Sequence, residues 1–319
     1  MPRIVFMGTP QVAVPSLEAL AAHPAAEIVG VFSQTAKPVG RHRQPRPSPV
    51  QQAAERLGIA VATPEKAGNP EAMAALDEWS PDLIVVCAYG RILPTRVLER
   101  PPLGPYNLHF SLLPRWRGAS PVQAAILAGD AATGVSLQRM VMELDAGAIA
   151  AETGPLPIHP ADTAETLAAR LAEAAAGLIA EALPRLLAGD PALEEQDPAG
   201  VTTCGIIRKE QGAVHWERDD AAQIERQWRA YTPWPGSYGF LGGKRLELIR
   251  MEGGTPSTAL LEPEPQPGTL LRDGWVAARE GFLRLIEVKP EGKRAMAIRD
   301  FLNGQPQALG MRLMPERSP

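Results

Sequence analysis

Three polar residues have types and a spacing that suit acyl-group transfer without a covalent enzyme intermediate: Asn107, His109 and Asp145. Asn107 and His109 are two residues apart, so on an extended strand their side chains point to the same side. Asp145 comes from a separate segment, and a distant carboxylate often orients a histidine. In such a site the amide can donate to a developing oxyanion, and a protonated imidazole can stabilise that charge or pass a proton. The carboxylate would hold the imidazole in place.

A purely structural interpretation of these residues stays open. Asn107 can end a strand, His109 can be a hydrogen-bonded core residue, and Asp145 can make a turn before Gly147. Spacing alone does not decide between the two interpretations, because a catalytic triad is defined by its geometry.

Apolar runs that alternate with helical segments predict the sheet that positions these residues. Strand–helix–strand order at this spacing indicates a Rossmann-like parallel sheet, which binds ligands at the carboxyl ends of its strands. No Gly-x-Gly-x-x-Gly loop and no Walker lysine follow the first strand, so no nucleotide site is expected there. Strands are expected over 3–7, 27–32, 59–63, 82–88, 106–109 and 134–141, and helices over 16–22, 50–57, 70–79, 120–129 and 162–187. Pro184 is expected to kink the last helix or end it early.

A change in composition after Leu187 divides the chain into two expected domains. The first, over 1–189, is the α/β catalytic domain, and a linker is expected over 190–207. The second, over 208–319, is expected to be a smaller β-barrel. It is predicted from a helix over 221–229 and short strands over 237–241, 245–250, 268–271, 275–278 and 283–288.

Composition limits the class of protein. The chain has 319 residues, 45% of them hydrophobic, and a formal net charge of −4, which fits two globular domains and does not indicate a nucleic-acid binder. Cys87 and Cys204 are far apart and no ligand cluster is evident, so no metal is expected and a reducing compartment is favoured. No apolar run has transmembrane length and a strand begins directly after Met1-Pro2, which favours a cytoplasmic protein without a membrane partner.

Positive charge is concentrated in two places. Residues 1–208 hold 16 Lys and Arg against 21 Asp and Glu, yet 33–50 contains four basic residues, four prolines and no acid. This segment is expected to be an exposed, partly mobile loop, either a solvated insertion or an arm that contacts phosphates. Its basic residues are Lys37, Arg41, Arg43 and Arg46. The same alternatives hold for Lys244, Arg245, Lys289, Lys293 and Arg294 in the second domain.

Several motifs resemble the methionyl-tRNA formyltransferase family over nearly the whole chain. The core signature is matched by Asn107-Leu-His109, Ser111-Leu-Leu-Pro-Arg-Trp-Arg-Gly118 and Leu144-Asp-Ala-Gly147. The Asn-x-His pair with a distant Asp is common to all formyl-tetrahydrofolate transferases, whereas the other blocks are narrower. These are Arg3-Ile-Val-Phe-Met-Gly-Thr-Pro10, Val14-Pro-Ser-Leu17, Ala88-Tyr-Gly-Arg-Ile-Leu-Pro94, Trp234-Pro-Gly236 and Pro290-Glu-Gly-Lys-Arg294.

The resemblance implies transfer of the formyl group of 10-formyltetrahydrofolate to the α-amino group of methionyl-initiator tRNA, for translation initiation. Asn107, His109 and Asp145 would be catalytic, no metal would take part, and the second domain would be OB-like. The expected partners are initiator methionyl-tRNA and tetrahydrofolate. The protein is expected to be a monomer. The tRNA contacts would come from Lys37, Arg41, Arg43, Arg46, Lys244, Arg245, Lys293 and Arg294.

A folate site is expected at two loops. In the family, the loop after the strand 82–88 cradles the pterin ring through backbone groups. The apolar segment 112–114 is expected to be exposed and to form a wall against the flat ring. The residues concerned are Tyr89, Gly90, Ile92, Ser111, Leu112, Leu113 and Pro114.

Other functions remain possible at this level. Formyl transfer to another amine, such as an amino-sugar nucleotide, or to water as in a hydrolase, uses the same three residues but needs neither the basic loop nor the barrel. A catalytically silent tRNA-binding protein needs none of the three. The sequence also departs from the family at Thr202-Thr-Cys-Gly-Ile206, which lacks the usual aromatic residue and lysine and weakens the expectation of a linker contact with tRNA. A milder departure is Gln34-Thr-Ala-Lys37.

Overall fold

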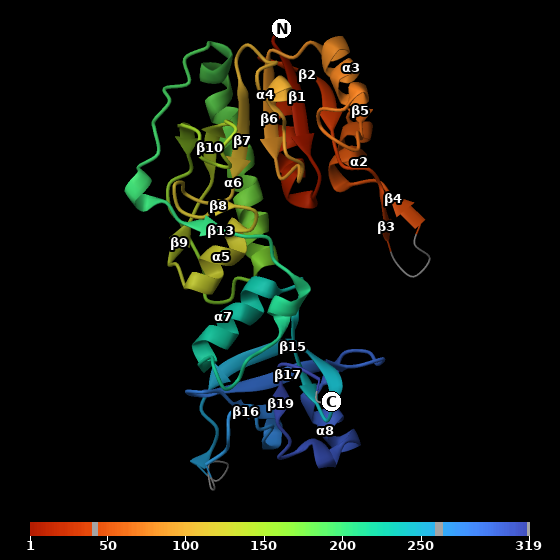
Figure 1. The fold of residues 1–319 in the computed structure, drawn as a ribbon, viewed down its shortest axis with the longest axis vertical. Helices are drawn as coiled ribbons and strands as arrows, with labels where there is room; N and C mark the ends of the chain where they lie inside the picture. The colour runs from red at the N-terminus through yellow and green to blue at the C-terminus, as the bar shows by residue number, and fades with distance from the viewer. Residues whose placement is uncertain (40–43, 259–263, 318–319) are drawn as a thin grey trace. The chain divides into compact units, whose positions relative to one another are not determined.

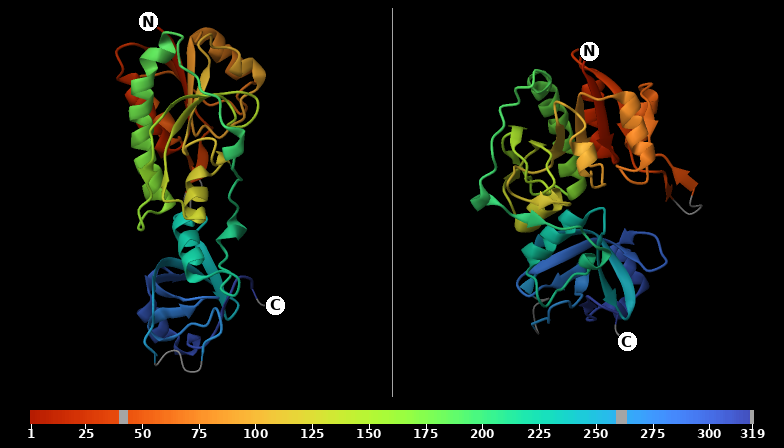
Figure 2. Two further views of the ribbon diagram at one scale, coloured as in Figure 1. Left: turned by 90° about the vertical axis from the view of Figure 1, so that its left-hand side faces the viewer. Right: turned by 45° about the horizontal axis from the view of Figure 1, so that its top comes forward.

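The computed structural model describes residues 1–39, 44–258 and 264–317, in two compact units (Figures 1 and 2). The first unit comprises residues 1–122, 131–158 and 166–205, and the second comprises residues 123–130, 159–165 and 206–319. None of the described helices is long and apolar enough to cross a membrane.

A seven-stranded sheet lies at the centre of the first unit, in the order β11-β10-β7-β6-β1-β2-β5. The five strands from β7 to β5 are parallel, whereas β10 and β11 run antiparallel at one edge. The expected parallel α/β sheet is therefore confirmed, with an antiparallel edge added. The bounds are β1 Arg3–Gly8, β2 Glu27–Phe32, β5 Val61–Ala62, β6 Leu83–Cys87, β7 Pro105–His109, β10 Ser136–Arg139 and β11 Ile149–Glu152.

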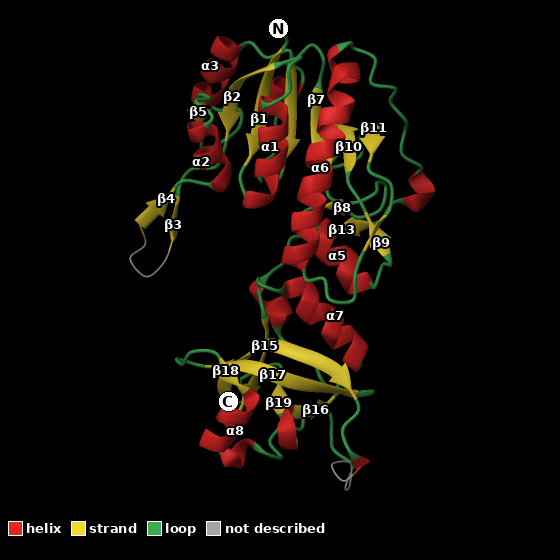
Figure 3. Cartoon of the chain, turned by 180° about the vertical axis from the view of Figure 1, so that it is seen from behind, coloured by secondary structure: helices red, strands yellow, loops and turns green. Residues whose placement is uncertain are grey.

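Helices cover both faces of this sheet because its central strands carry apolar side chains on each side. On one face, α3 (Pro70–Trp79) and α4 (Thr95–Leu98) pack against buried residues of β1 and β6: Val5, Met7, Ile84 and Val86. Over the other face lie α1 (Val14–Ala21) and α6 (Ala164–Leu187), which stand in front of the sheet in Figure 3. Helix α6 continues through Pro184 to Leu187, so the expected early end does not occur.

The pairing of β7 with β10 determines which side chains meet at the edge of the parallel part. Asn107 lies opposite Gln138, and His109 lies opposite Ser136. After β10 the chain turns back through residues 140–147, and this turn carries Asp145. An antiparallel strand at this edge therefore returns a carboxylate to the strand that holds the amide and the imidazole.

Smaller elements complete the first unit. Within the basic segment 33–50, β3 and β4 form an antiparallel pair that leads into α2, and residues 40–43 between the strands lie outside the described residues. A second pair, β9 and β12, is also antiparallel. The bounds are β3 Lys37–Val39, β4 Gln44–Arg46, α2 Pro49–Arg56, β9 Ala132–Thr133 and β12 Leu156–Pro157, with 3₁₀ turns at Gln11–Ala13 and Pro198–Gly200. Helix α5 (Pro121–Ala128) begins in the first unit and has most of its residues in the second.

Residues 190–205 run along the first unit and belong to it. Ile149 and Glu194 exchange backbone hydrogen bonds of 2.8 and 2.9 Å. Further along, β13 (Thr203–Cys204) pairs in parallel with β8 (Arg117–Gly118). This segment therefore fixes the loop that follows His109.

Gly118 is the point of closest approach between β8 and β13. Its φ is 122°, and a Cβ atom there would lie 2.0 Å from the carbonyl oxygen of Cys204. We expect Gly118→Ala to lower the free energy of unfolding by about 3 kcal/mol or more, because both the backbone and the pairing must shift.

The matched control for this substitution is Gly177→Ala in α6, where an added Cβ meets no atom within 4 Å. We expect it to raise the free energy of unfolding by about 0.5–1 kcal/mol, since alanine is the better helix former. Urea unfolding followed by circular dichroism compares the two variants. A Gly118→Ala protein as stable as the wild type would contradict the packing described here.

The second unit is built on a curled antiparallel sheet in the order β16-β17-β15-β14-β19, with β18 paired to β17. Register shifts in β15 between Leu248 and Met251 are irregularities of the kind that bend a strand. The core gathers around the fully buried Trp216, with α7 and α8 contributing Ile224 and Phe301. The bounds are α7 Ala221–Tyr231, β14 Ser237–Leu241, β15 Lys244–Gly254, β16 Trp275–Ala277, β17 Phe282–Pro290, β18 Met296–Ala297, α8 Ile298–Gly304 and β19 Leu313–Met314, with 3₁₀ turns at Lys209–Gly212, Arg272–Gly274 and Pro306–Ala308.

Candidate active site

Asn107, His109 and Asp145 converge in the first unit. Strand β7 carries Asn107 and ends at His109, and Asp145 lies in the turn after β10. Asn107 Nδ2 is 3.5 Å from Asp145 Oδ1, and His109 Nδ1 is 3.6 Å from Asp145 Oδ2. The structure thus brings the three residues together around one carboxylate.

Two further donors hold the Asp145 carboxylate. Gln138 Nε2 donates to Oδ1 at 2.7 Å, and the backbone N–H of Gly118 donates to Oδ2 at 2.9 Å. Asp145 has a φ of 53°, a left-handed conformation that Asp and Asn adopt more readily than most residues. Gln196 supports this turn by donating from Nε2 to the carbonyl groups of Asp145 and Gly147, at 2.9 and 2.7 Å. The carboxylate is therefore held by groups that are far apart in the sequence.

His109 faces an acceptor at each ring nitrogen. Its Nε2 lies 2.9 Å from the carbonyl oxygen of Trp116, and because a carbonyl only accepts, Nε2 carries a proton. Its Nδ1 faces Asp145, so an imidazolium ion can donate on both sides. The Cys204 thiol also donates to the Trp116 carbonyl at 3.5 Å, and burial raises the pKa of Cys204, so this thiol keeps its proton.

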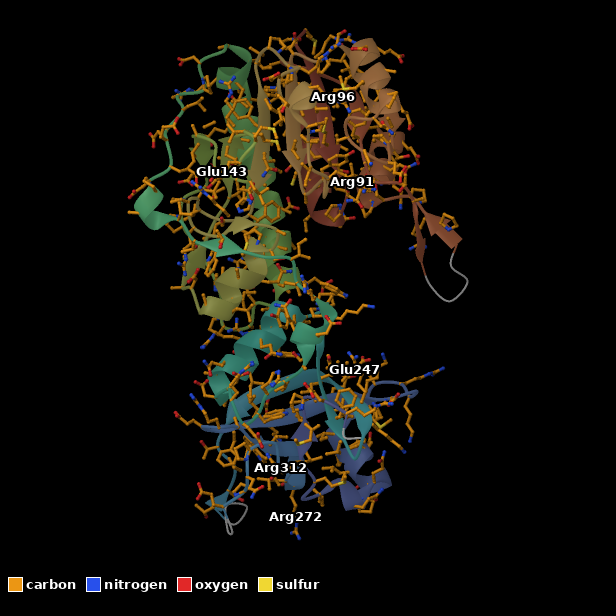
Figure 4. All side chains as sticks on the ribbon, viewed as in Figure 1. Arg91, Arg96, Glu143, Glu247, Arg272 and Arg312 are labelled. Carbon is orange, nitrogen blue, oxygen red and sulfur yellow. The ribbon has the colours of Figure 1, made fainter. Side chains whose placement is uncertain are left out.

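The loop after His109 is anchored by residues of the segment 190–205. The N–H of Trp116 donates to Thr202 Oγ1 at 2.9 Å, and Arg117 Nε donates to Gln196 Oε1 at 2.9 Å. Arg117 Nη1 also lies 3.7 Å from Glu143 Oε1, at the position labelled in Figure 4. These contacts connect the His109 loop to the Asp145 turn. Sequence reasoning missed Gln138, Gln196 and Thr202, for which no local motif exists.

The loop after β6 is fixed through its backbone. Gln34 Nε2 donates to the carbonyl groups of Tyr89 and Gly90 at 2.9 and 3.1 Å, and Thr9 Oγ1 donates to that of Tyr89 at 2.9 Å. Tyr89 is buried, which raises the pKa of its hydroxyl, and that hydroxyl has no hydrogen-bond partner among the described residues. Ile92 is 89% exposed in the same loop, next to Arg91, which Figure 4 labels. The loop therefore offers an ordered backbone and an apolar side chain to a ligand.

The prediction that the segment Leu112–Pro114 is exposed is wrong for Leu113. Leu113 is buried, and its N–H donates to Ser136 Oγ at 2.9 Å. Ser111 is buried as well, because the hydrogen bonds to Ser136 draw this segment against β10. Leu112 and Pro114 remain half-buried.

Exposed apolar side chains lie instead in the turn that precedes Asp145. Val141, Met142 and Leu144 are all exposed, although a turn on the surface usually carries polar residues. The sequence contains this signal as an apolar run directly before Asp145, but the run resembles the end of a strand. These residues and Ile92 are candidates for contact with an apolar ring.

The residues expected to contact tRNA fall in both units. Arg46 is exposed and lines a cavity of about 490 Å³ together with Thr9, Gln34, Ser48 and Arg56. Arg41, Arg43 and the side chain of Lys37 lie outside the described residues.

In the second unit, Lys244, Lys293 and Arg294 are exposed. Arg245 is half-buried, and its guanidinium lies 3.7 Å from the centroid of the Tyr238 ring. Its backbone N–H donates to Glu291, which lowers the pKa of that exposed carboxyl group. Lys289 is paired with Glu247 at 3.0 Å, at the position labelled in Figure 4.

The described residues hold no candidate metal cluster, and the Cys87 thiol keeps its proton at neutral pH. No group of three or more His, Cys, Asp or Glu among them is arranged to hold a metal ion. Burial raises the pKa of Cys87 to about 12, so this thiol is not a nucleophile at neutral pH.

Comparison with known proteins identifies both parts of the chain. The formyl transferase family matches residues 2–183, and the formyl transferase C-terminal domain matches residues 206–306. A methionyl-tRNA formyltransferase of Paracoccus denitrificans is 44% identical, over 95% of this chain and 97% of that protein. One of Gluconobacter oxydans is 42% identical, over 98% of this chain and the whole of that protein.

Solved structures with a similar fold are more distant in sequence. HypX from Aquifex aeolicus, in complex with tetrahydrofolic acid, superposes with a TM-score of 0.63 at 18% identity, over 96% of this chain. The chain spans about half the length of HypX, 48%. An N-formyltransferase from Helicobacter canadensis, in complex with folinic acid and dTDP-3-aminofucose, superposes with a TM-score of 0.64 at 16% identity, over 89% of this chain and 98% of that one.

Proposed function

This chain belongs to the methionyl-tRNA formyltransferase family, and we propose that Asn107, His109 and Asp145 carry out its formyl transfer. The enzyme moves the formyl group of 10-formyltetrahydrofolate to the α-amino group of methionyl-initiator tRNA, the step that prepares this tRNA for translation initiation. One observation supports the site assignment. The Asn107 amide and the His109 imidazole lie 3.5 and 3.6 Å from the two oxygens of the Asp145 carboxylate.

In the proposed mechanism the neutral amine of the methionyl group attacks the formyl carbon. A tetrahedral intermediate forms, and its oxyanion accepts a hydrogen bond from Asn107 Nδ2, of which one hydrogen faces Asp145 and the other is available. The bond to N10 of the folate then breaks, the proton lost by the amine is transferred to N10, and tetrahydrofolate leaves.

His109 stabilises the same oxyanion as a cation held by Asp145. In the structure its Nε2 donates to the Trp116 carbonyl, so the oxyanion replaces this carbonyl as the acceptor during the reaction. The surrounding residues favour such an exchange, because Trp116 keeps its hydrogen bond from the Cys204 thiol. His109 is only 5% exposed, which keeps competing water away from the ring.

We propose that the folate ring lies against the loop after β6 and the turn before Asp145. Gln34 and Thr9 hold the backbone carbonyl groups of the first loop, and the exposed Ile92, Val141 and Leu144 supply apolar surface. The Tyr89 carbonyl already accepts two hydrogen bonds and the Gly90 carbonyl accepts one, so the Gly90 carbonyl and the apolar side chains are the groups that suit a flat heterocycle with N–H donors. Leu112 and Pro114 are half-buried and contribute at the edge, whereas Tyr89, Ser111 and Leu113 are buried behind this surface.

We propose that the acceptor end of the tRNA contacts the cavity lined by Arg46. We also propose that the second unit contacts the tRNA through Lys244, Lys293 and Arg294. We propose a catalytic domain over 1–189, a linker over 190–207 and a tRNA-binding domain over 208–319. We also propose that the enzyme works as a monomer in the cytoplasm, where initiator tRNA is used. Sedimentation of the purified protein tests the monomer.

Reversal of the charge at Arg46 is expected to weaken tRNA binding without changing the rate of formyl transfer. We expect Arg46→Glu to raise the KM for methionyl-tRNA by about tenfold near 0.1 M salt, with kcat within about twofold, because a phosphate contact becomes a repulsion. The control is Arg185→Glu, which changes an arginine that is also exposed, on α6, and should leave KM unchanged. Equal KM values for the two variants would remove Arg46 from the tRNA site.

The acceptor is tested by separate incubations with each candidate. The protein is incubated with 10-formyltetrahydrofolate and methionyl-initiator tRNA, an amino-sugar nucleotide, or water alone, and tetrahydrofolate is measured. We expect one tetrahydrofolate for each formylated tRNA and none above background with the other acceptors. Efficient formylation of the sugar, or release of formate without tRNA, would overturn the proposal.

A further inference from the structure

We infer that Gln138 is a positioning residue for formyl transfer, which holds and polarises the Asp145 carboxylate through its side-chain amide. The inference rests on the proposed function of Asn107, His109 and Asp145, to which it adds a fourth member. Gln138 lies on β10 directly opposite Asn107 of β7, and its side chain is only 2% exposed.

The two carboxylate oxygens of Asp145 have different hydrogen-bond partners. Oδ1 accepts from Gln138 at 2.7 Å, the shortest contact to this carboxylate, and has Asn107 at 3.5 Å. Oδ2 accepts from the Gly118 N–H at 2.9 Å and faces His109 at 3.6 Å. Gln138 therefore fixes the oxygen that does not face the imidazole, and so sets the rotation of the oxygen that does.

The orientation of the Gln138 amide follows from its partner. An ionised carboxylate only accepts hydrogen bonds, so Nε2 must face Asp145 and Oε1 must point elsewhere. That Oε1 atom is buried and has no hydrogen-bond partner among the described residues. A buried acceptor without a donor costs free energy, so an apolar residue would be the more stable choice at this position. The amide is thus explained by its contact with Asp145 and not by the packing of the core.

A donor at 2.7 Å restricts the rotation of the ionised carboxylate. Asp145 must be ionised and correctly rotated to hold His109 as a cation, so loss of the Gln138 donor should slow the transfer step. The other ionisable groups that face Asp145 are His109 from β7 and Cys204 from β13. Substrate binding should change little, because the Gln138 side chain is buried.

Two variants test the inference. Gln138→Met keeps the length of the side chain but removes the donor, and we expect kcat to fall by about 10- to 100-fold with both KM values within about twofold. Gln138→Glu places a second carboxyl group beside Asp145, which can donate only when it is protonated. We expect its kcat, divided by that of the wild type at the same pH, to be at least about tenfold lower at pH 8 and to recover towards pH 5.5.

The control is Gln227→Met in the second unit, where a buried glutamine donates to the backbone carbonyl groups of Gln211 and Ala213. It should lower stability but leave kcat unchanged. If Gln138→Met keeps wild-type kcat, or if the Gln138→Glu ratio does not change with pH, Gln138 fills space only and the inference fails. If the wild type itself formylates no tRNA, the proposed function fails and this inference fails with it.

Discussion

Replacement of Asp145 by asparagine is expected to lower kcat by about 10³-fold or more while the protein remains folded. Each oxygen of the carboxylate faces donors: Gln138 on one side, and the Gly118 N–H with His109 on the other. Whichever oxygen becomes an NH₂ group, a donor then opposes a donor and the imidazolium loses its counter-charge. The fold should persist because asparagine tolerates the φ of 53° found at this position.

The control for this variant is Asp273→Asn. Asp273 also has a left-handed conformation, with a φ of 58°, and it is exposed in the second unit. It should show wild-type kcat, measured with saturating 10-formyltetrahydrofolate and methionyl-tRNA. If Asp145→Asn retains more than about a tenth of the wild-type kcat, Asp145 does not act through its charge.

Replacement of Asn107 by alanine should lower kcat by about 10²–10³-fold, the usual cost of losing one oxyanion donor. The Kd for folate should stay within about twofold, because the donor acts on a charge that develops only after the amine attacks. Equilibrium binding of folate and single-turnover formyl transfer measure the two quantities separately. Near-normal turnover with weakened folate binding would make Asn107 a binding residue.

Asn69→Ala is the matched control for the Asn107 substitution. Asn69 caps α3 by accepting from the N–H of Ala72 at 2.9 Å, and it has no contact with the site. Its loss should lower the free energy of unfolding by about 1 kcal/mol without an effect on kcat. Comparison of the two variants therefore distinguishes an asparagine that affects kcat from one that affects only stability.

Much of the fold could be predicted from the sequence because its signals are local. The strand Glu27–Phe32, the helix Pro70–Trp79 and the strand Ser237–Leu241 have the predicted bounds. Each is a short apolar or amphipathic run between turn-forming residues, so neighbours in sequence determine it. The Asn107 and His109 pair was found for the same reason, since a spacing of two residues survives in any extended strand.

The remainder of the site depends on contacts that no local pattern contains. Gln138 meets Asn107 only through the register of β7 and β10, and Gln196 reaches Asp145 from 51 residues away. The burial of Leu113 follows from one hydrogen bond to Ser136, which an isolated Leu-Leu-Pro run does not reveal. Tertiary pairing therefore decides which polar residues surround the carboxylate, whereas the sequence identifies the carboxylate itself.

The most direct test of the account compares two tRNAs in one assay. Wild-type protein is mixed with 10-formyltetrahydrofolate and either methionyl-initiator tRNA or methionyl-elongator tRNA, and N-formylmethionine is measured after hydrolysis. We expect rapid formylation of the initiator, with one tetrahydrofolate released per product, and little or none of the elongator. Equal rates on both tRNAs would contradict selection of the initiator, and no formylation of either would contradict the assigned reaction.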